Sequence, residues 1–445
     1  MREALVPETE EVTAESGRPL RVLILSWEYP PVLVGGLGRH VHALATSLAA
    51  AGHQVTVVTR HAGDAPLDEI REGVRVVRAP EDPPTFPLAT PSLLAWTMAF
   101  NHALTRAALH ATLTDTYDLI HAHDWLVTHT AVTLRDHLGV PLVATIHATE
   151  AGRHQGWLPE EMNRTIHTVE YWLGHEAAHV ITCSGYMRWE VAHLLDLSEE
   201  QITVIPNGVH APIWQAAPRA VARARARYAD TGPMIGFAGR LVYEKGVQHL
   251  VHALPELRDR HPGLRLVVAG DGPYKPELQA EVSRLRLDRH VHFAGFVGND
   301  LAATFAASDT VVVPSIYEPF GMVALEAAAA GAPLAVAATG GLAEIVEPGI
   351  TGLTFPAKNP EALAEAVSTL LADNPTARRM AHQARTMVRS RYDWTGIAAR
   401  TADAYRATID NTPERRAQAR ARLAVRRAPI VVPEGNLLAV GGAAG

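Results

Sequence analysis

The sequence lacks the features of secreted and membrane-spanning proteins. Its single cysteine, Cys183, cannot form an intramolecular disulfide, which is typical of a reducing compartment. No run of about eighteen apolar residues is present, and residues 1–17 lack the basic and apolar regions of a signal peptide. We therefore expect a cytoplasmic protein in which Cys183 is a buried thiol.

The sequence also lacks an excess of basic residues. Lys and Arg number 40 against 47 Asp and Glu, so the formal net charge is -7. This balance argues against a nucleic-acid partner, because neutralising phosphates requires a net basic face. Residues 414–427 are a local exception that carries six arginines. We interpret residues 412–445 as a basic, flexible tail, with a docking arm as the alternative.

What the sequence does contain is an alternation of short apolar runs with amphipathic segments of helical period. At 445 residues the chain is too long for one ordinary core. Strand-like runs recur from residue 21 to residue 207, and a fresh series begins near residue 233. Helices long enough for crossovers separate them, which predicts an α/β protein with two doubly wound parallel sheets.

These patterns divide the chain into successive parts. The acidic segment at the start has little that could pack, so we expect it to be disordered. Two Rossmann-like domains then follow, and after them a helix that packs back on the first domain. The predicted boundaries are 1–18 for the leader, 19–208 and 209–390 for the domains, 391–411 for the helix, and 412–445 for the tail.

A glycine-rich loop follows the first predicted strand. It reads Gly35-Gly36-Leu37-Gly38 and opens a helix, where free backbone N–H groups and the helix dipole favour an anion. The loop lacks the third glycine of a dinucleotide fingerprint. Gly35 and Gly36 therefore predict a sugar-phosphate site, and a purely structural turn is the alternative.

Two cations follow the first strand of the second series. Arg240 comes directly after the run MIGFAG, and Lys245 lies five residues later at the start of a helix. Fixed positive charge at this place suits a diphosphate, which gains negative charge as it leaves. Surface salt bridging is the alternative interpretation.

Two carboxylates follow a later strand of the same series. Glu318 precedes a predicted helix over 321–330, and Glu326 lies within it. The first can accept hydrogen bonds from sugar hydroxyls and the second from a ribose, while backbone N–H groups meet phosphate. We expect Phe320, Gly321 and Met322 at this donor-binding turn. Helix capping and solvation are the alternatives.

Histidines end two strands of the first series, at His121-Ala122-His123-Asp124 and at His147. This is the sheet edge where α/β proteins bind ligands. No zinc-type spacing follows, so we expect hydrogen bonding to a sugar and no metal. The polar loop after His147 contains Trp157, which could stack on a pyranose ring.

Taken together, these residues resemble the retaining glycosyltransferases of family 4, the glycogen-synthase-like group with the two-Rossmann GT-B architecture. The resemblance extends over roughly residues 20–400. Within this group the sequence resembles most the actinobacterial enzymes that elongate α-1,4-glucans of glycogen or methylglucose lipopolysaccharides. The motifs that carry it occur in family order: SWEYPP with VGGLG, HAHDW, TIH, IPNGV, GRLVYEKG, AGDGP and EPFGMVALE.

The resemblance implies a hexosyltransferase with two domains facing a central cleft. It implies that Gly36 contacts the donor sugar-phosphate, that Asp124 and His147 bind sugar hydroxyls, and that Arg240 with Lys245 holds the diphosphate. Glu318 would face the transferred glucose and Glu326 the ribose. It further implies retention of configuration, no metal and no other cofactor, a nucleotide-glucose donor and an α-glucan or oligosaccharide acceptor.

Five alternatives stay open at this point. The loop at Val34 has no lysine before its glycines, unlike bacterial glycogen synthases, so the donor could be UDP-glucose or ADP-glucose. The hexose could be mannose from GDP-mannose, or the acceptor a phosphosugar such as glucose 1-phosphate. A glycoside hydrolase using Glu318 and Glu326 would not need the Arg240/Lys245 pair. A catalytically silent nucleotide-sugar sensor would keep the fold without turnover.

Overall fold

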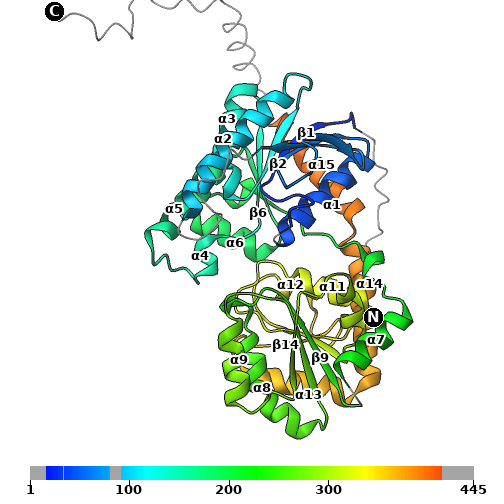
Figure 1. Ribbon diagram of the computed structural model, residues 1–445. Helices are drawn as coiled ribbons and strands as arrows, with labels where there is room; N and C mark the ends of the chain where they lie inside the picture. The colour runs from blue at the N-terminus through cyan, green and yellow to red at the C-terminus, as the bar shows by residue number, and fades with distance from the viewer. Residues whose placement is uncertain (1–16, 34, 81–91, 230, 413–445) are drawn as a thin grey trace, which may run out of the picture.

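Two parallel sheets, each covered by helices, form the two lobes seen in Figure 1. The computed structural model describes residues 17–33, 35–80, 92–229 and 231–412. The predicted basic tail lies outside the described residues apart from residue 412, and the predicted leader lies outside them apart from residues 17 and 18. The fold prediction, two Rossmann-like parallel sheets of the α/β class, is confirmed.

The first sheet has eight strands, and β1 occupies an inner position. All strand pairs in this sheet are parallel except β3 with β4. Buried β-branched and leucine side chains dominate the inner strands, as expected for a sheet covered on both faces. In spatial order the strands are β3 (Asp68–Arg71), β4 (Val74–Ala79), β2 (Gln54–Arg60), β1 (Arg21–Leu25), β5 (Leu119–His123), β6 (Leu142–Ile146), β7 (His179–Thr182) and β8 (Ile202–Val204).

The second sheet has six strands, and all its pairings are parallel. Its core is again built from Val, Leu, Ile and Ala side chains between the sheet and its helices. In spatial order the strands are β11 (Val291–Gly295), β10 (Arg265–Ala269), β9 (Met234–Ala238), β12 (Thr310–Val313), β13 (Leu334–Ala337) and β14 (Leu353–Phe355).

Helices follow most strands and cover both sheets (Figure 1). No helix in the described ranges is long and apolar enough to cross a membrane. The helices are α1 (Gly36–Ala50), α2 (Leu93–Ala111), α3 (Thr128–Leu138), α4 (Glu150–Arg153), α5 (Glu161–Glu176), α6 (Gly185–Leu194), α7 (Pro218–Tyr228), α8 (Val247–Arg260), α9 (Lys275–Arg284), α10 (Leu301–Ala307), α11 (Met322–Ala330), α12 (Leu342–Ile345), α13 (Pro360–Ala372), α14 (Asn374–Arg391) and α15 (Trp394–Asp410).

The chain passes between the lobes twice. The two crossings are joined by a hydrogen bond from the Val209 N–H to the Tyr392 carbonyl at 2.8 Å. After the second crossing α15 lies along α1 on the first lobe (Figure 1). Trp394 and Tyr405 of α15 belong to the same buried cluster as Val22 and Ile24 of β1. We keep residues 208 and 390 as the proposed domain boundaries, because both lie at these crossings.

Two parts of the fold differ from the sequence-based expectation. The antiparallel pair β3–β4 extends the first sheet at a place where no strand was predicted, because exposed charged residues such as Asp68 and Arg71 mask the alternation of β3. The predicted helix over 321–330 begins at Met322, since Gly321 has a φ of 116° and serves as its N-cap.

Candidate functional site

The predicted site residues lie where the strand order of each sheet reverses. In the first sheet the chain leaves β1 toward β2 on one side and returns to β5 on the other. In the second sheet the same reversal lies between β9 and β12. Open α/β sheets bind ligands at the carboxyl ends of strands at such points. Asp124 directly follows β5, and Glu318 lies in the loop after β12.

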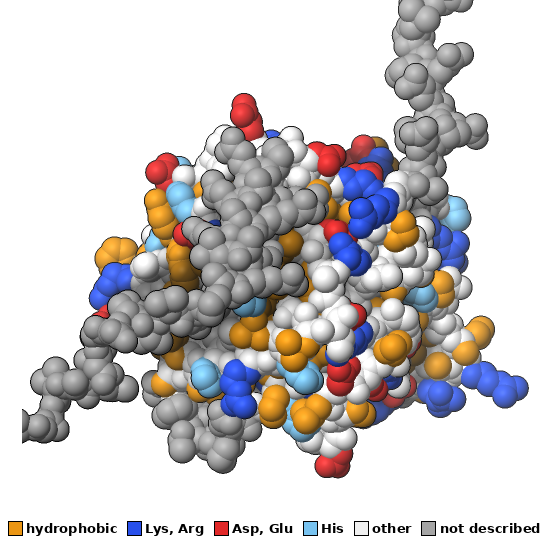
Figure 2. Space-filling model, turned by 90° about the horizontal axis from the view of Figure 1, so that it is seen from above, with side chains coloured by type: hydrophobic (Ala, Val, Ile, Leu, Met, Phe, Trp, Pro, Cys, Tyr) orange, Lys and Arg blue, Asp and Glu red, His pale blue; other side chains and the backbone are white. Residues whose placement is uncertain are grey.

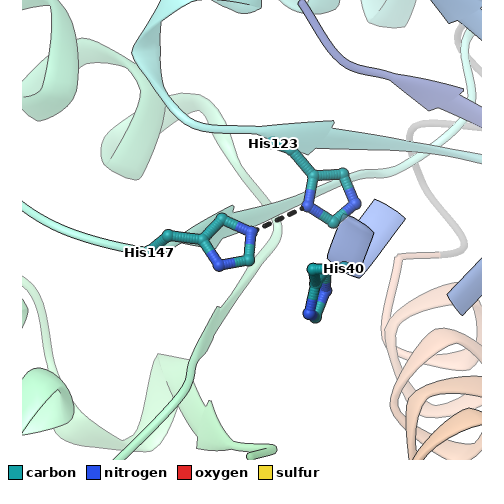
Figure 3. Close-up of side chains that lie close together, drawn as sticks. All are labelled: His40, His123 and His147. Atoms are coloured by element: carbon teal, nitrogen blue, oxygen red, sulfur yellow. Dashed lines mark hydrogen bonds between the residues drawn. The ribbon is translucent and has the colours of Figure 1, made fainter. Parts of the chain in front are cut away.

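Three histidines gather at the reversal point of the first sheet. His123 ends β5, His147 follows β6, and His40 lies on α1 (Figure 3). His123 Nδ1 and His147 Nε2 are hydrogen-bonded at 3.0 Å, and the rings of His40 and His147 lie 4.6 Å apart, edge to face. Burial lowers the pKa of His147 to about 4. The imidazole is therefore neutral at physiological pH and can donate to or accept from a hydroxyl.

Asp124 fixes the turn that carries His147. It adopts a φ of 60°, which is uncommon for a residue other than glycine. Its Oδ1 accepts a hydrogen bond from the backbone N–H of His147 at 2.8 Å. Burial raises the pKa of Asp124 to about 6, although that N–H and the charge of Arg153 act in the opposite direction. The predicted pair Asp124 and His147 is thus brought together.

His121 differs from its neighbours because both of its ring nitrogens have partners. Nε2 is hydrogen-bonded to Thr145 Oγ1, and Nδ1 to Tyr405 Oη of α15, each at 2.7 Å. The ring is fully buried. His121 is therefore a structural residue that connects the last helix to β5 and supports the ring of His123 at 4.1 Å.

The glycine-rich loop is occupied by a carboxylate of the same lobe. Glu28 Oε2 accepts hydrogen bonds from the N–H groups of Gly35 at 3.0 Å and Gly38 at 3.4 Å. Gly36 is exposed, and a Cβ placed there would meet nothing within 4 Å. Two of the N–H groups at the predicted anion site thus already have a partner. Gly36 is the position at which a ligand could approach the backbone.

At the reversal point of the second sheet, each predicted cation has a carboxylate partner. Lys245 Nζ donates to Glu318 Oε2 at 2.8 Å, and Ser315 Oγ donates to the same oxygen at 2.9 Å. Arg240 lies 3.6 Å from Glu244, and its side chain is 62% exposed. Lys245 and Glu318 are thus adjacent, a pairing that the sequence analysis did not predict, whereas Arg240 lies near another carboxylate.

Glu326 makes an ion pair with the other lobe. Arg39 of α1 donates to Glu326 Oε1 at 2.8 Å. Burial raises the pKa of Glu326 to about 7, and the charge of Arg39 and its hydrogen bond lower it. The carboxylate predicted for a ribose therefore lies against the helix that follows the glycine-rich loop.

The turn before α11 is tightly packed. The Phe320 side chain is buried and contacts the ring of Tyr392 at the crossing between lobes. A Cβ on Gly321 would lie 2.6 Å from Leu342 Cδ2, so only glycine fits. Met322 is partly buried against the core. Any contact of Phe320 or Gly321 with a ligand must therefore use backbone groups.

Contacts between lobes surround these residues. Ser184 Oγ donates to the carbonyl of Pro319 at 2.7 Å. The carboxylate of Glu344 on α12 accepts the N–H groups of Gly185 at 2.9 Å and Tyr186 at 2.7 Å at the start of α6. In Figure 1 these two helices face each other across the junction. Both reversal points thus lie close to the contacts between the lobes.

The remaining predictions concern the surface. Trp157 is 70% exposed, which leaves its ring free to stack on a ligand, and Cys183 is buried as expected. The face shown in Figure 2 mixes basic, acidic and apolar side chains among the described residues. Among the described residues, charges of one sign do not gather on this face.

Four residues of the site were missed by sequence reasoning. His40 and Arg39 follow the glycine-rich loop, and their position one turn into α1 on a cleft helix could have singled them out. Glu28 belongs to the motif SWEYPP, which we interpreted only as a loop. Glu344 gave no signal, because its partners are backbone N–H groups far away in the sequence.

Comparison with known proteins gives consistent matches along the chain. Residues 34–211 match the family model Glycosyltransferase Family 4, and residues 219–387 match Glycosyl transferases group 1. A glycogen synthase of Mycobacterium tuberculosis is 45% identical over 399 residues, which cover 87% of this chain and 94% of that protein. A D-inositol 3-phosphate glycosyltransferase of Kineococcus radiotolerans is 34% identical over 434 residues, covering 90% and 98%.

The fold also matches solved structures. The sucrose-phosphate synthase of Thermosynechococcus elongatus superimposes with a TM-score of 0.77 at 27% identity, covering 88% of this chain and all of that one. Its coverage includes both lobes, so the likeness extends beyond a single Rossmann-like domain.

Proposed function

We infer the reaction from one premise: this chain belongs to the glycogen-synthase-like group of GT-B glycosyltransferases and is a hexosyltransferase. We propose that it transfers glucose from UDP-glucose or ADP-glucose to the end of an α-1,4-glucan. The glucan acceptor rests on the 45% identity with a glycogen synthase. In each turnover the enzyme would add one glucose to the glucan and release the nucleoside diphosphate.

The observation that carries the proposal is the contact between Arg39 and Glu326. This ion pair, with 2.8 Å between the Arg39 guanidinium and Glu326 Oε1, joins α1 of the first lobe to α11 of the second. A nucleotide-sugar bound between them would touch both lobes at once. In the proposal, Glu326 exchanges Arg39 for the ribose hydroxyls when the donor enters.

The charges near Glu318 suit a leaving diphosphate. Lys245 and Glu318 neutralise each other at 2.8 Å. We assign Lys245 and the exposed Arg240 to the diphosphate, and Glu318 to hydroxyls of the transferred glucose. Preorganised cations stabilise the charge that grows as the glycosidic bond breaks. Phe320, Gly321 and Met322 contribute backbone groups at the start of α11.

On the first lobe, neutral His147 and the adjacent Asp124 bind hydroxyls of the sugar, and Gly36 allows the donor phosphate to approach the backbone. We propose retention by attack on the same face of the sugar. The acceptor oxygen bonds to C1 while the C1–O bond to phosphate breaks, and the acceptor proton passes to the departing phosphate oxygen. This route needs no side-chain nucleophile, metal or further cofactor.

Closure of the lobes protects the donor from water. The contacts of Ser184 with Pro319 and of Glu344 with the start of α6 hold the lobes together at the rim. Hydrolysis of the sugar nucleotide is thereby disfavoured until an acceptor hydroxyl is in place.

A phosphosugar acceptor is the second candidate. It is favoured by the relatives named D-inositol 3-phosphate glycosyltransferase, at 30–34% identity. The main proposal is preferred because the identity with the glycogen synthase is higher, at 45%.

The test is a matrix of donors and acceptors. UDP-glucose, ADP-glucose and GDP-mannose are each incubated with glycogen, maltooligosaccharide, glucose 1-phosphate or inositol 3-phosphate, and product and nucleoside diphosphate are both measured. We expect elongated glucan with one of the glucose donors. Transfer only to a phosphosugar, or only from GDP-mannose, would overturn the glucan assignment. Binding of the donor without release of diphosphate would indicate a sensor.

A further inference from the structure

We propose that His40, His123 and His147 form a binding site for a divalent d-block cation of the Zn²⁺ class, and that its occupancy blocks glycosyl transfer. The binding itself depends only on the three histidines. The blocking rests on the proposed function, in which His147 binds the sugar. The site is inhibitory, so it is compatible with metal-free catalysis.

The spacing of the ring nitrogens suits a single ion. One nitrogen from each histidine lies within 4.8 Å of the other two, and His123 Nδ1 lies 3.0 Å from His147 Nε2. Zn²⁺ binds imidazole at about 2.0–2.1 Å in tetrahedral geometry, which places neighbouring nitrogens roughly 3.3 Å apart. Two of the three ligands are therefore already near their required separation, and the His40 nitrogen, which lies within 4.8 Å of the other two, must approach by at most roughly 1.5 Å.

The cluster has unused bonding capacity. His40 Nδ1 is buried and has no hydrogen-bond partner in the described part of the chain, whereas His123 Nδ1 and His147 Nε2 bond only to each other and would exchange that hydrogen bond for the ion. His121, the fourth histidine nearby, is excluded as a ligand because Tyr405 and Thr145 occupy both of its nitrogens. The set that can bind an ion is thus His40, His123 and His147.

The cluster is held by rigid elements yet open on one side. Its members come from the end of β5, the end of β6 and the second turn of α1. His40 and His123 are buried, whereas His147 is partly exposed (Figure 3). An ion bound by all three would retain one open position for water. Three imidazoles with an open fourth position are a common arrangement for Zn²⁺.

The donor set also decides which ions bind. Neutral imidazole suits Zn²⁺, Co²⁺, Ni²⁺ and Cu²⁺, whereas Mg²⁺ and Ca²⁺ prefer oxygen ligands. The nearby carboxylate of Asp124 is turned to the backbone N–H of His147. We therefore expect Co²⁺ and Zn²⁺ to bind and Mg²⁺ not to compete.

Metal binding is tested on the full-length protein after treatment with a chelator. Co²⁺ is added and its visible absorption is followed, then Zn²⁺ is added to displace it, with Mg²⁺ as the negative probe. We expect one high-affinity ion per chain with the spectrum of a tetrahedral nitrogen site. His40→Gln should weaken binding by at least about tenfold. The exposed His252→Gln is the matched control and should bind like the wild type.

Equal binding in His40→Gln and wild type, or equal displacement by Mg²⁺, would overturn the site. His147→Gln, at a partly exposed position, gives the same readout if His40→Gln fails to fold. Inhibition of transfer by Zn²⁺ is measured separately, with reversal by chelator and protection by the sugar nucleotide. Unchanged transfer at a Zn²⁺ concentration that saturates the Co²⁺ site would overturn the blocking. A protein that binds Co²⁺ but transfers no sugar would refute the proposed function and leave the metal site standing.

Discussion

Arg39 and Glu326 form an ion pair in which the carboxylate is almost completely buried and the guanidinium is half exposed, with side-chain exposures of 3% and 49%. Burial raises the pKa of Glu326 to about 7, and Arg39 offsets only part of this effect. Glu326 therefore changes its charge within the physiological pH range, at the contact between the two lobes.

The first prediction concerns the pH dependence of stability. Because the folded-state pKa of Glu326 lies above the ordinary value, this group stabilises the fold below about pH 4.5 and loses that effect as pH rises through about 7. Glu326→Gln does not ionise, so its stability relative to wild type should rise from about pH 5 to pH 8, by up to about 3 kcal/mol. Thermal unfolding measured across this range checks it, with the exposed Glu361→Gln as control. A difference that does not vary with pH would refute it.

The second prediction concerns the diphosphate. Lys245→Ala and Arg240→Ala should each lower turnover by roughly 10²-fold or more, by analogy with removing one preorganised donor from a transition state. Steady-state release of nucleoside diphosphate is the measurement. Arg284→Ala removes an exposed arginine of α9 that pairs with Glu281 and should leave turnover unchanged. Near-wild-type rates in both cleft variants would exclude the clamp.

The third prediction separates backbone strain from steric clash in the loop of Lys245. Gly246 has a φ of 70°, and a Cβ there would lie 1.9 Å from the carbonyl oxygen of Pro314. Gly349 has a similar φ of 76° with nothing within 4 Å. Gly349→Ala should therefore cost about 1 kcal/mol of stability, and Gly246→Ala at least about 2 kcal/mol more. Denaturant unfolding of the two variants gives the comparison, and equal losses would argue against the clash.

The fourth prediction concerns the junction of the lobes. Glu344→Ala removes a carboxylate that accepts two N–H groups at the start of α6. Loss of about 1–2 kcal/mol from the closed state should shift the opening equilibrium roughly five- to thirtyfold. Small-angle scattering should show a larger radius of gyration, and the KM for the donor should rise. Glu347→Ala, an exposed neighbour, is the control, and a Glu344→Ala protein with the same radius would refute the latch.

The fold, and the strand ends at which the candidate site residues lie, could be predicted from the sequence because both depend on local patterns. Buried strands such as β9 appear in the sequence as apolar runs, and the turns after them contain the polar and charged residues of the candidate site. Asp124, His147, Lys245 and Glu318 follow strand ends, so parallel pairing alone brings them to the sheet edge. Lys245 and Glu318 are 73 residues apart along the chain, and they are adjacent because β9 pairs with β12.

The rest depends on tertiary packing within and between the lobes, and no local pattern encodes that. The pairing of Arg39 with Glu326 joins residues 287 apart. The gathering of His40 with His123 and His147 required the crossing of α1 over the end of β5. The pairing of Arg240 with Glu244, which lies in a short 3-10 helix at Tyr243–Lys245, was not predicted either. Such side-chain directions are set by tertiary packing.

The position of α15 has a consequence for how this protein is made. Its Trp394 and Tyr405 complete the interior of the first lobe, yet they are synthesised after the entire second lobe. On the ribosome, the first sheet must therefore wait, with its interior incomplete, while the second lobe emerges and folds. During that interval its apolar surface is exposed to aggregation and to chaperones. The first lobe thus reaches its final form only after the second lobe has been synthesised.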